Sequence, residues 1–270
     1  MNWSTEAEEA VAKIPFFVRR RVKKRVEEEA ARTSSATVEM RHVIAGKKRF
    51  MESMEKEVRG HQLENCFGPG GCPNRAVHAD DLMKHLDKLL SEKALLKFLK
   101  GIVDGPLKLH HEFRVTIAEC PNACSRPQIA DLGIIGAARP VVTDEECSRC
   151  LECVEACKEG AVSLAHDADY PLIDYGRCVL CGHCVDVCPT GTIAREADGY
   201  RIQLGGKLGR HPQLATEISG IHSELGTVEI VERCVSHYKM NNNNGERFGE
   251  ILNRTGLGFL NPCRVTSTED

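Results

Sequence analysis

Apolar side chains recur at helical spacing through the first hundred residues. Ser4 or Thr5 can cap a short helix that ends before Pro15, which marks the start of a second helix. The second helix has a narrow apolar stripe, which consists of Val18, Val22 and Val26. A turn and a further helix are predicted over residues 38–58. One amphipathic helix, or two, is predicted over residues 81–100, because leucines recur there at helical spacing between lysines.

Strand patterns follow in the middle of the chain. Residues 113–118 alternate in a way that places Arg114 and Thr116 on one face of a strand and apolar residues on the other. Residues 131–137 are predicted to form a second apolar strand. Together with the helices, these strands predict an α+β fold.

The C-terminal part is predicted to be helical and structural. A helical stripe consists of Val228, Val231, Val235 and Tyr238, and a polar loop over residues 241–244 separates it from a short closing helix. Cys234 lies on or beside the stripe and is interpreted as a buried thiol. Cys263 has no partner at ligand spacing, and neither cysteine is assigned as a ligand.

Composition and charge narrow the functional classes. The chain has 270 residues, enough for one or two domains, and its net charge of -3 points to no nucleic acid and no membrane as a partner. The N-terminus is polar, and no apolar run reaches the roughly 18 residues that span a bilayer. The 14 cysteines could form an extracellular disulfide framework, but their C-x2-C clustering favours metal clusters in a reducing cytoplasm. We therefore expect a cytoplasmic protein.

Eight of these cysteines form a repeated pattern, C-x2-C-x2-C-x3-C. The two runs are Cys147, Cys150, Cys153 and Cys157, and Cys178, Cys181, Cys184 and Cys188. This is the signature of bacterial two-cluster ferredoxins, in which the fourth cysteine of each run ligates the other cluster. One predicted set is therefore Cys147, Cys150, Cys153 and Cys188, and the other is Cys178, Cys181, Cys184 and Cys157. Zinc ribbons would show paired C-x2-C groups instead. Lys158 replaces the usual proline, which shapes the turn and donates no ligand.

Four further cysteines carry a different spacing. Cys66 and Cys72 form C-x5-C around a glycine-rich loop, and Cys120 and Cys124 form C-x3-C. This arrangement resembles the cluster motif of the sirohaem-containing sulfite and nitrite reductases. The resemblance implies that the four thiolates hold a third [4Fe–4S] cluster and that Cys124 also binds the sirohaem iron. The loop glycines would let backbone N–H groups point at the cluster.

Polar residues beside these cysteines are candidate cofactor-binding groups. Asn74 and Arg75 follow Cys72, and Asn122 lies between Cys120 and Cys124. Arg75 is interpreted as a partner for a sirohaem carboxylate, with an ordinary surface arginine as the alternative.

The order of the motifs indicates an insertion. In the resembling reductases the strand over residues 199–207 lies near the strand that ends at Ala137, so the ferredoxin pattern interrupts the sirohaem domain, as in the dissimilatory sulfite reductase subunits. Such a loop tolerates an insertion because its two ends are already close. The implied fold is a sirohaem/[4Fe–4S] reductase half-domain over residues 46–140 and 196–270 with an inserted two-cluster ferredoxin-like domain over residues 141–195.

The N-terminal residues 1–45 form a separate predicted module. Its sequence from Ile14 to Arg19 resembles the helical module of the light-independent protochlorophyllide reductase B subunit, which covers a tetrapyrrole site. Six arginines and lysines lie between Val18 and Val26. They fit either a solvated helix with i,i+4 ion pairs or a lid whose cations pair with sirohaem carboxylates.

These resemblances imply a six-electron reduction of sulfite to sulfide. The predicted cofactors are sirohaem and three [4Fe–4S] clusters. The predicted partner is an external low-potential donor that supplies the electrons. Arg114, Lys207 and Arg210 are the candidate catalytic cations for the substrate anion, and a homo-oligomer could supply further ones. His110 and His111 are interpreted as a surface pair, with proton donation as the alternative. Alternative functions are a nitrite reductase of the same family and a non-catalytic electron-transfer subunit of a larger complex.

Overall fold

The computed structural model describes residues 1–260, which fall into two compact units. The first unit comprises Met1–Arg59 and Val103–His110, and the second comprises Gly60–Ile102 and the chain from His111 onward. Cys263, which the sequence assigns no ligand role, lies outside the described residues.

The first unit is helical. Its helices are α1 (Thr5–Ala12), α2 (Phe16–Arg32) and α3 (Met40–Glu57), and the strands β1 (Asn2–Trp3) and β2 (Thr37–Val38) pair in parallel. The Ser4 hydroxyl accepts a hydrogen bond from the Ala7 N–H at 3.4 Å, which is the predicted N-cap. A small core joins the elements through Ala7, Val26, Ala30 and Val38. The predicted stripe of α2 therefore contributes Val26 to this core, with Val22 packed beside it.

Three of the six cations between Val18 and Val26 on α2 have partners inside this unit. Arg19 donates hydrogen bonds to the backbone carbonyls of Ala12 and Ile14. Lys23 lies over the Trp3 ring and Arg25 lies over the Phe50 ring, at 5.2 and 4.8 Å from the ring centroids. Part of the basic character of α2 thus stabilises the helical unit itself.

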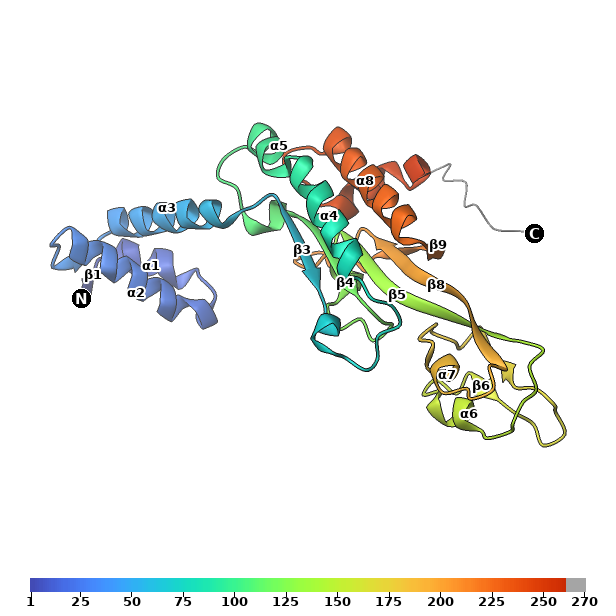
Figure 1. The fold of residues 1–270 in the computed structure, drawn as a ribbon. Coiled ribbons are helices and arrows are strands. Elements are labelled where there is room, and N and C mark those ends of the chain that lie inside the picture. The colour runs from blue at the N-terminus through green and yellow to red at the C-terminus, as the bar shows by residue number, and fades with distance from the viewer. Residues whose placement is uncertain (261–270) are drawn as a thin grey trace. The chain divides into compact units, whose positions relative to one another are not determined.

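The second unit contains a five-stranded mixed sheet in the order β3-β4-β5-β8-β9 (Figure 1). Its strands are β3 (His61–Asn65), β4 (Phe113–Ala118), β5 (Leu132–Val142), β8 (Ile193–Leu204) and β9 (Thr216–His222). The first three strands are parallel, whereas β8 and β9 are antiparallel to their neighbours. The predicted strands over 113–118 and 131–137 are confirmed, and β5 continues further, to Val142. The expected proximity of the strand around 199–207 to Ala137 is also confirmed, because Ala137 pairs with Gly199.

Helices cover one face of this sheet (Figure 1). They include α4 (Asp80–Glu92), α5 (Leu95–Ile102) and α8 (Glu224–Asn241), and α9 (Phe248–Thr255) follows α8. The predicted amphipathic pattern over 81–100 is two helices, because Ala94 has a positive φ of 48° that no α-helix continues through. The core between helices and sheet includes Phe113, whose ring centroid lies 5.1 Å from that of Tyr238 and 5.3 Å from that of Phe248.

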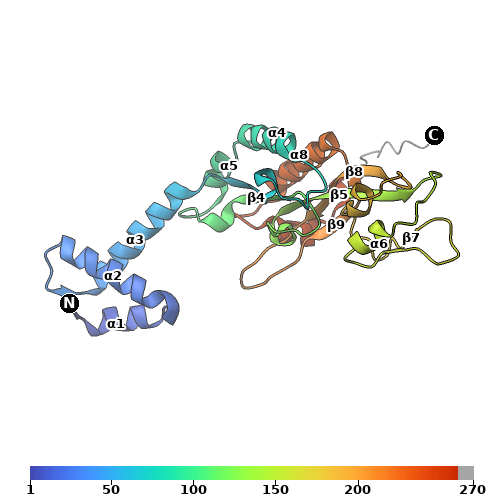
Figure 2. The ribbon, with the colours of Figure 1, turned by 60° about the horizontal axis from the view of Figure 1, so that its bottom comes forward.

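The segment between β5 and β8 has little regular structure. We call residues 143–192 the repeat segment, because they contain both ferredoxin-like runs of cysteines. The segment holds α6 (Glu152–Ala156), β6 (Val162–Ser163), β7 (Leu172–Ile173) and α7 (His183–Asp186). It lies at the far end of the β5–β8 pair in both views (Figures 1 and 2). The Ala138 N–H donates to the Leu180 carbonyl at 2.8 Å, so strand β5 is bonded directly to one cysteine loop.

Two smaller expectations are corrected. His111 is only 8% exposed, so the interpretation of a surface pair is wrong for this residue, whose carbonyl accepts a hydrogen bond from the buried Tyr238 hydroxyl. The predicted loop over 241–244 begins one residue later, because α8 includes Asn241. Cys234 is fully buried, as predicted. None of the helices in residues 1–260 is long and apolar enough to cross a bilayer.

Candidate functional site

The carboxyl ends of β3 and β4 bring two cysteine loops together. These strands are parallel neighbours, so the residues that follow them meet at one edge of the sheet. Cys66 follows β3, and its N–H donates to the Ile117 carbonyl of β4 at 3.0 Å. The Cys66 sulfur lies within 3.4 Å of the backbone nitrogens of Gly68 and Glu119. We call Cys66, Cys72, Cys120 and Cys124 the sheet-edge site.

The thiols of the sheet-edge site form one group. Burial raises the pKa of the Cys120 thiol, and the nearby Cys66, Cys72 and Cys124 raise it further, although the Asn122 N–H opposes the shift. Without metal, these shifts favour the protonated thiol. Bound iron ions would favour the thiolate instead, because metal binding releases the thiol protons. Cys120 is buried, whereas Cys124 is exposed. Cys124 is therefore the residue of the four that a further ligand can reach most easily from solvent.

Glu119 is the buried hub of the sheet-edge site. It is fully buried, and its Oε1 accepts hydrogen bonds from the Asn65 side chain at 3.2 Å and from the Ala79 N–H at 3.3 Å. Its Oε2 lies 3.8 Å from the Arg75 Nε and has no hydrogen-bond partner. Arg75, predicted to meet a sirohaem carboxylate, thus faces a carboxylate of the protein. The sequence signal for Glu119 is its place between an apolar strand and Cys120.

The repeat segment folds as two equivalent loops. Arg149 and Leu180 occupy the same position in their runs and both have positive φ, 56° and 62°. Leu151 and Gly182 are equivalent too, with φ of 65° and 79°, and each directly precedes a short helix. In each run, a residue with left-handed backbone conformation stands on either side of the second cysteine, and this pair turns the backbone around a common centre. The internal repeat in the sequence is therefore a repeat in backbone conformation.

The thiols of the repeat segment gather in two crossed sets. Burial raises the pKa of Cys184 to about 12, and its thiol neighbours are Cys181, Cys178 and Cys157. Burial also raises the pKa of Cys153, whose thiol neighbours are Cys188, Cys150 and Cys147. In each set the structure thus brings together three cysteines of one run and the last cysteine of the other. We call them the Cys184 set and the Cys153 set.

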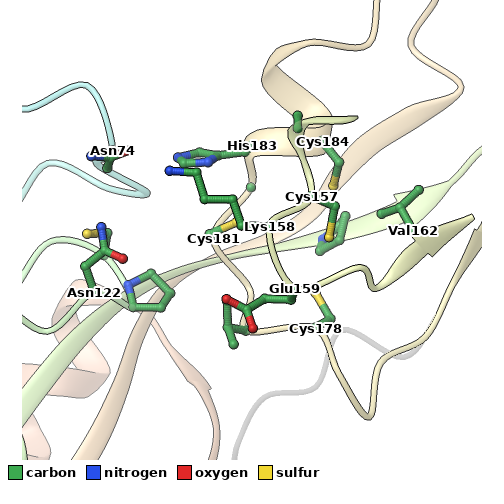
Figure 3. Close-up of a pocket in the computed structure, with 16 residues that line it drawn as sticks. Asn74, Asn122, Cys157, Lys158, Glu159, Val162, Cys178, Cys181, His183 and Cys184 are labelled. Atoms are coloured by element: carbon green, nitrogen blue, oxygen red, sulfur yellow. The ribbon is translucent and has the colours of Figure 1, made fainter. Parts of the chain in front are cut away.

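A cavity of about 70 Å³ connects the Cys184 set with the sheet-edge site. All four cysteines of the set line it, and Asn74 and Asn122 lie on the opposite side (Figure 3). Cys120 of the sheet-edge site is also among its lining residues. The Cys153 set lines a separate cavity of about 10 Å³, whose walls come from the repeat segment and the first residue of β8. The Cys184 set is therefore the one that adjoins the sheet-edge site.

A second polar cavity, of about 150 Å³, lies beside β4. Three arginines line it, namely Arg114, Arg126 and Arg247. The Nε of Arg114 is buried without a hydrogen-bond partner, and Arg126 has a positive φ of 60° just after the Cys124 loop. Arg247 donates two hydrogen bonds to the buried Asp131 carboxylate, at 3.0 and 2.9 Å. Glu64 also lines the cavity, so Arg114 and Arg126 leave it an excess of one positive charge, which suits an anion.

The other predicted catalytic cations lie elsewhere. Lys207 is 7% exposed, and its Nζ lies 2.7 Å from Oε1 of Glu250. Arg210 is exposed on the loop that follows β8. The structure does not bring either residue into the cavity that Arg114 lines, and Leu208 is the residue of their loop that reaches it. Sequence reasoning missed Arg126 and Arg247, although Arg126 stands two residues after Cys124.

Two known protein families match this chain. Residues 62–261 match the nitrite and sulphite reductase 4Fe-4S domain family, which covers the sheet, the sheet-edge site and the repeat segment. The chain belongs to this family. Residues 3–47 match a second model, the proto-chlorophyllide reductase 57 kD subunit, in agreement with the resemblance of the N-terminal helices. The resemblance predicted from the cysteine spacing is thereby confirmed.

Curated relatives of this 4Fe-4S domain protein are larger. The coenzyme F420-dependent sulfite reductase of Methanocaldococcus jannaschii is 32% identical over 199 residues, which are 72% of this chain and 29% of that protein. A subunit of the anaerobic sulfite reductase of Salmonella typhimurium is 30% identical over 105 residues, 39% of this chain and 26% of that protein. The aligned part of this chain thus spans less than a third of either relative.

Among solved structures, this chain is similar to a dissimilatory sulfite reductase I. That match has a TM-score of 0.49 and 16% identity, and it covers 77% of this chain and 55% of the other. The NirA protein of Mycobacterium tuberculosis matches with a TM-score of 0.37 and 19% identity over 71% of this chain and 25% of that chain.

The donor sets of this family member fit iron–sulfur clusters. Residues 1–260 contain no group of three or more Cys, His, Asp or Glu arranged around a single metal ion. A [4Fe–4S] cluster needs a wider arrangement, because each of its irons takes a different thiolate. Each of the three groups brings four thiols together. The protein is an iron–sulfur protein.

Proposed function

We propose that this chain is a sirohaem-dependent sulfite reductase whose cysteines hold three [4Fe–4S] clusters. The proposed domains are a helical module over residues 1–45, a reductase half-domain over 46–140 and 196–270, and a two-cluster ferredoxin insertion over 141–195. Sulfite is favoured over nitrite because the curated relatives are named as sulfite reductases. The observation that carries the proposal is the cavity shared by the Cys184 set and the sheet-edge site.

The cysteines have distinct roles in this proposal. Cys66, Cys72, Cys120 and Cys124 would hold the cluster next to the sirohaem, and Cys124 would bind the sirohaem iron through the same sulfur. The exposure of Cys124 supports this role, since the other three thiols of the site are buried or half-buried. When bound, these groups supply single electrons at low potential and an open iron position for the anion.

The repeat segment would deliver the electrons from an external low-potential donor. The Cys184 set adjoins the sheet-edge site, and the Cys153 set is enclosed in the repeat segment away from it. Electrons would therefore enter at the Cys153 set. Asn74 and Asn122 line the junction, and Asn74 points its side-chain nitrogen at the Cys72 sulfur at 4.0 Å. Both asparagines would then stabilise the thiolates at the point of transfer.

Cations beside β4 would hold the anionic groups. Arg114 and Arg126 line one cavity, and the side chain of Arg114 has a buried nitrogen that lacks a partner. They would bind either a carboxylate of the sirohaem or the substrate anion, and they would stabilise negative charge on the oxygen atoms as S–O bonds break. Lys207 would contribute to this site only if Glu250 releases its ammonium group. Arg210, which is exposed on the same loop, is a further proposed contributor. A second copy of the chain could complete the site.

The first test is composition and turnover. Anaerobically purified protein should contain about 13 iron and 12 sulfide per chain, which is three cubanes and the iron of one sirohaem. Turnover with reduced methyl viologen should be faster with sulfite than with nitrite. Cys124→Ala should lose the tetrapyrrole spectrum and the activity, whereas Cys234→Ala, a fully buried thiol outside the sets, should keep both. Three cubanes without tetrapyrrole would instead support an electron-transfer subunit.

The anion cavity has its own test. Arg114→Gln should raise KM for sulfite by about tenfold or more, because a hydrogen bond to a charged group is worth about 1.5–3 kcal/mol. Arg233→Gln on α8 is the matched control, since Arg233 lines a different hollow of the surface. Equal KM values for the two variants would exclude Arg114 from substrate binding.

A further inference from the structure

The residue that follows the last cysteine differs in charge between the two runs. Pro189 follows Cys188, the last cysteine of the second run, and Lys158 follows Cys157, the last cysteine of the first run. Because the last cysteines are exchanged between the sets, Lys158 is attached to the Cys184 set and Pro189 to the Cys153 set. At this position the Cys184 set thus has a cation and the Cys153 set has a neutral ring. The runs also differ in charge at Arg149 and Glu152, whose counterparts are Leu180 and His183. The Arg149 side chain is directed to the backbone carbonyls of Ala165 and His166.

Lys158 lines the cavity of only one of the two sets. It lines the cavity of about 70 Å³ that the Cys184 set shares with Cys120 and Asn122, and its side chain extends toward the Asn74 and Asn122 side (Figure 3). Pro189 lines the separate cavity of the Cys153 set.

The charge of Lys158 is not neutralised by a direct ion pair. In residues 1–260, no carboxylate lies within salt-bridge distance of its ammonium group. Glu159 also lines the cavity and is the nearest carboxylate in sequence, while its backbone carbonyl accepts a hydrogen bond from Arg177. His183 is the other titratable side chain of this wall. The Lys158 charge therefore contributes to the field at the junction.

We propose that Lys158 raises the reduction potential at the Cys184 set above that at the Cys153 set, and so directs electrons toward the sheet-edge site. The proposal rests on the three clusters of the proposed function. Reduction adds one negative charge to a cluster, so a nearby cation stabilises the reduced form more than the oxidised form. One electron leaves the Cys153 side, which is oxidised, and arrives at the Cys184 side, which is reduced. No proton or other group is transferred.

Redox titration of three variants tests this role. Lys158→Gln removes the charge, Lys158→Arg keeps it, and Pro189→Lys adds one beside the other set. The anaerobic, fully loaded protein is titrated with dithionite and mediators, and the reduced clusters are followed by electron paramagnetic resonance. Lys158→Gln should lower one midpoint and Pro189→Lys should raise a different one. The expected size is up to about tenfold in the reduced-to-oxidised ratio at a fixed potential, or about 59 mV for a one-electron couple.

Two further readouts separate charge from folding. Lys158→Arg should keep the wild-type midpoints, and the shift in Lys158→Gln should shrink at high ionic strength, because salt screens an exposed charge. If all variants load three clusters and Lys158→Gln moves no midpoint, the role of Lys158 is wrong while the proposed function stands. The same holds if Lys158→Gln and Pro189→Lys move the same midpoint. If wild-type protein fails to load three clusters, both proposals fail.

Discussion

The sheet-edge site and the repeat segment hold cysteines in opposite ways. At the sheet-edge site, strands of a five-stranded sheet deliver the loops, and a buried carboxylate, Glu119, ties them together. The repeat segment has helices of only five and four residues and strands of two. Its buried core consists of Cys153, Val162, Ile173, Cys184 and Ile193, so two of its five members are cysteines of the donor sets.

The two regions therefore differ in the source of their folding free energy. The sheet buries a continuous apolar core whether or not metal is bound, and this burial is the main driving force for folding. The repeat segment buries too few apolar groups to offset the entropy of ordering its loops. With the two clusters of the proposed function bound there, metal binding would supply part of its folding free energy, as in other small metal-binding domains.

The largest expected effect comes from removing the metal. Chelation of iron from the loaded protein should abolish hydrogen-exchange protection in the repeat segment while the amides of β4 and of β5 up to Ala137 stay protected. The reason is that the sheet and its helices pack without the clusters, and the segment does not. Hydrogen exchange followed by mass spectrometry measures both regions in one sample. Simultaneous loss of protection in the sheet would contradict the comparison.

The next effect concerns the buried ion pair that supports the sheet. Asp131 is 1% exposed and accepts hydrogen bonds from the Arg247 side chain and from the N–H groups of Arg114 and Phe248. Burial raises its pKa, and the Arg247 guanidinium opposes the shift. Arg247→Met should destabilise the sheet by about 3–5 kcal/mol, because it leaves a buried carboxyl without its cation.

A surface ion pair provides the control for this variant. Arg254 pairs with Glu246 at 2.8 Å, with the two side chains 45% and 31% exposed. Arg254→Met should cost at most about 1 kcal/mol, since exposed pairs contribute little. Urea unfolding monitored by far-ultraviolet circular dichroism compares the two variants. Similar losses for both would mean that the Asp131 pair adds no more than a surface contact.

A smaller effect is expected from a glycine pair in the Cys66–Cys72 loop. A Cβ on Gly68 would lie 1.9 Å from Oε2 of Glu119, whereas a Cβ on Gly70 would meet nothing within 4 Å. Gly68→Ala should therefore cost about 1–3 kcal/mol by forcing Glu119 to move. Gly70→Ala should be neutral or stabilise slightly, since it restricts the unfolded chain. Thermal unfolding separates them, and equal midpoints would show that Glu119 does not clamp this loop.

The smallest effect is a pH dependence in the helical layer. Burial lowers the pKa of His237, and the nearby Arg254 lowers it further. The folded state therefore favours the neutral ring, so its stabilising contribution is complete above the ordinary pKa of 6.5 and is lost as pH falls through the folded value. Wild-type protein should lose more stability between pH 7.5 and 5.5 than His237→Gln. Identical losses in the two proteins would leave His237 without this role.

The sequence predicts the parts of the molecule that have a strong local pattern. The cysteine spacings anticipate three sets of thiols that the fold brings together, and the alternation over residues 113–118 predicts β4 to the residue. The edge strands β3 and β9 are not predicted. Each pairs on one side only and carries mostly exposed or half-buried side chains, so neither has an apolar alternation to read.

Long-range partners could not be predicted. The sequence suggests Lys207 as a substrate ligand, whereas its partner in the fold, Glu250, stands 43 residues away on another element. Glu119 and Asp131 look like ordinary acidic residues beside apolar strands, yet each is buried and holds several backbone or side-chain donors. Only packing in three dimensions decides which charges meet.

The pairing of β5 with β8 has a consequence for spacing. The ladder runs from Leu132 opposite Leu204 to Val142 opposite Ile193, and an isolated bridge joins Ala138 to Cys181. A slip of this ladder by one residue would carry the repeat segment about 3.4 Å along the strand and turn its side chains to the other face. The hydrogen-bond register between β5 and β8 thus sets the distance between the Cys184 set and the sheet-edge site.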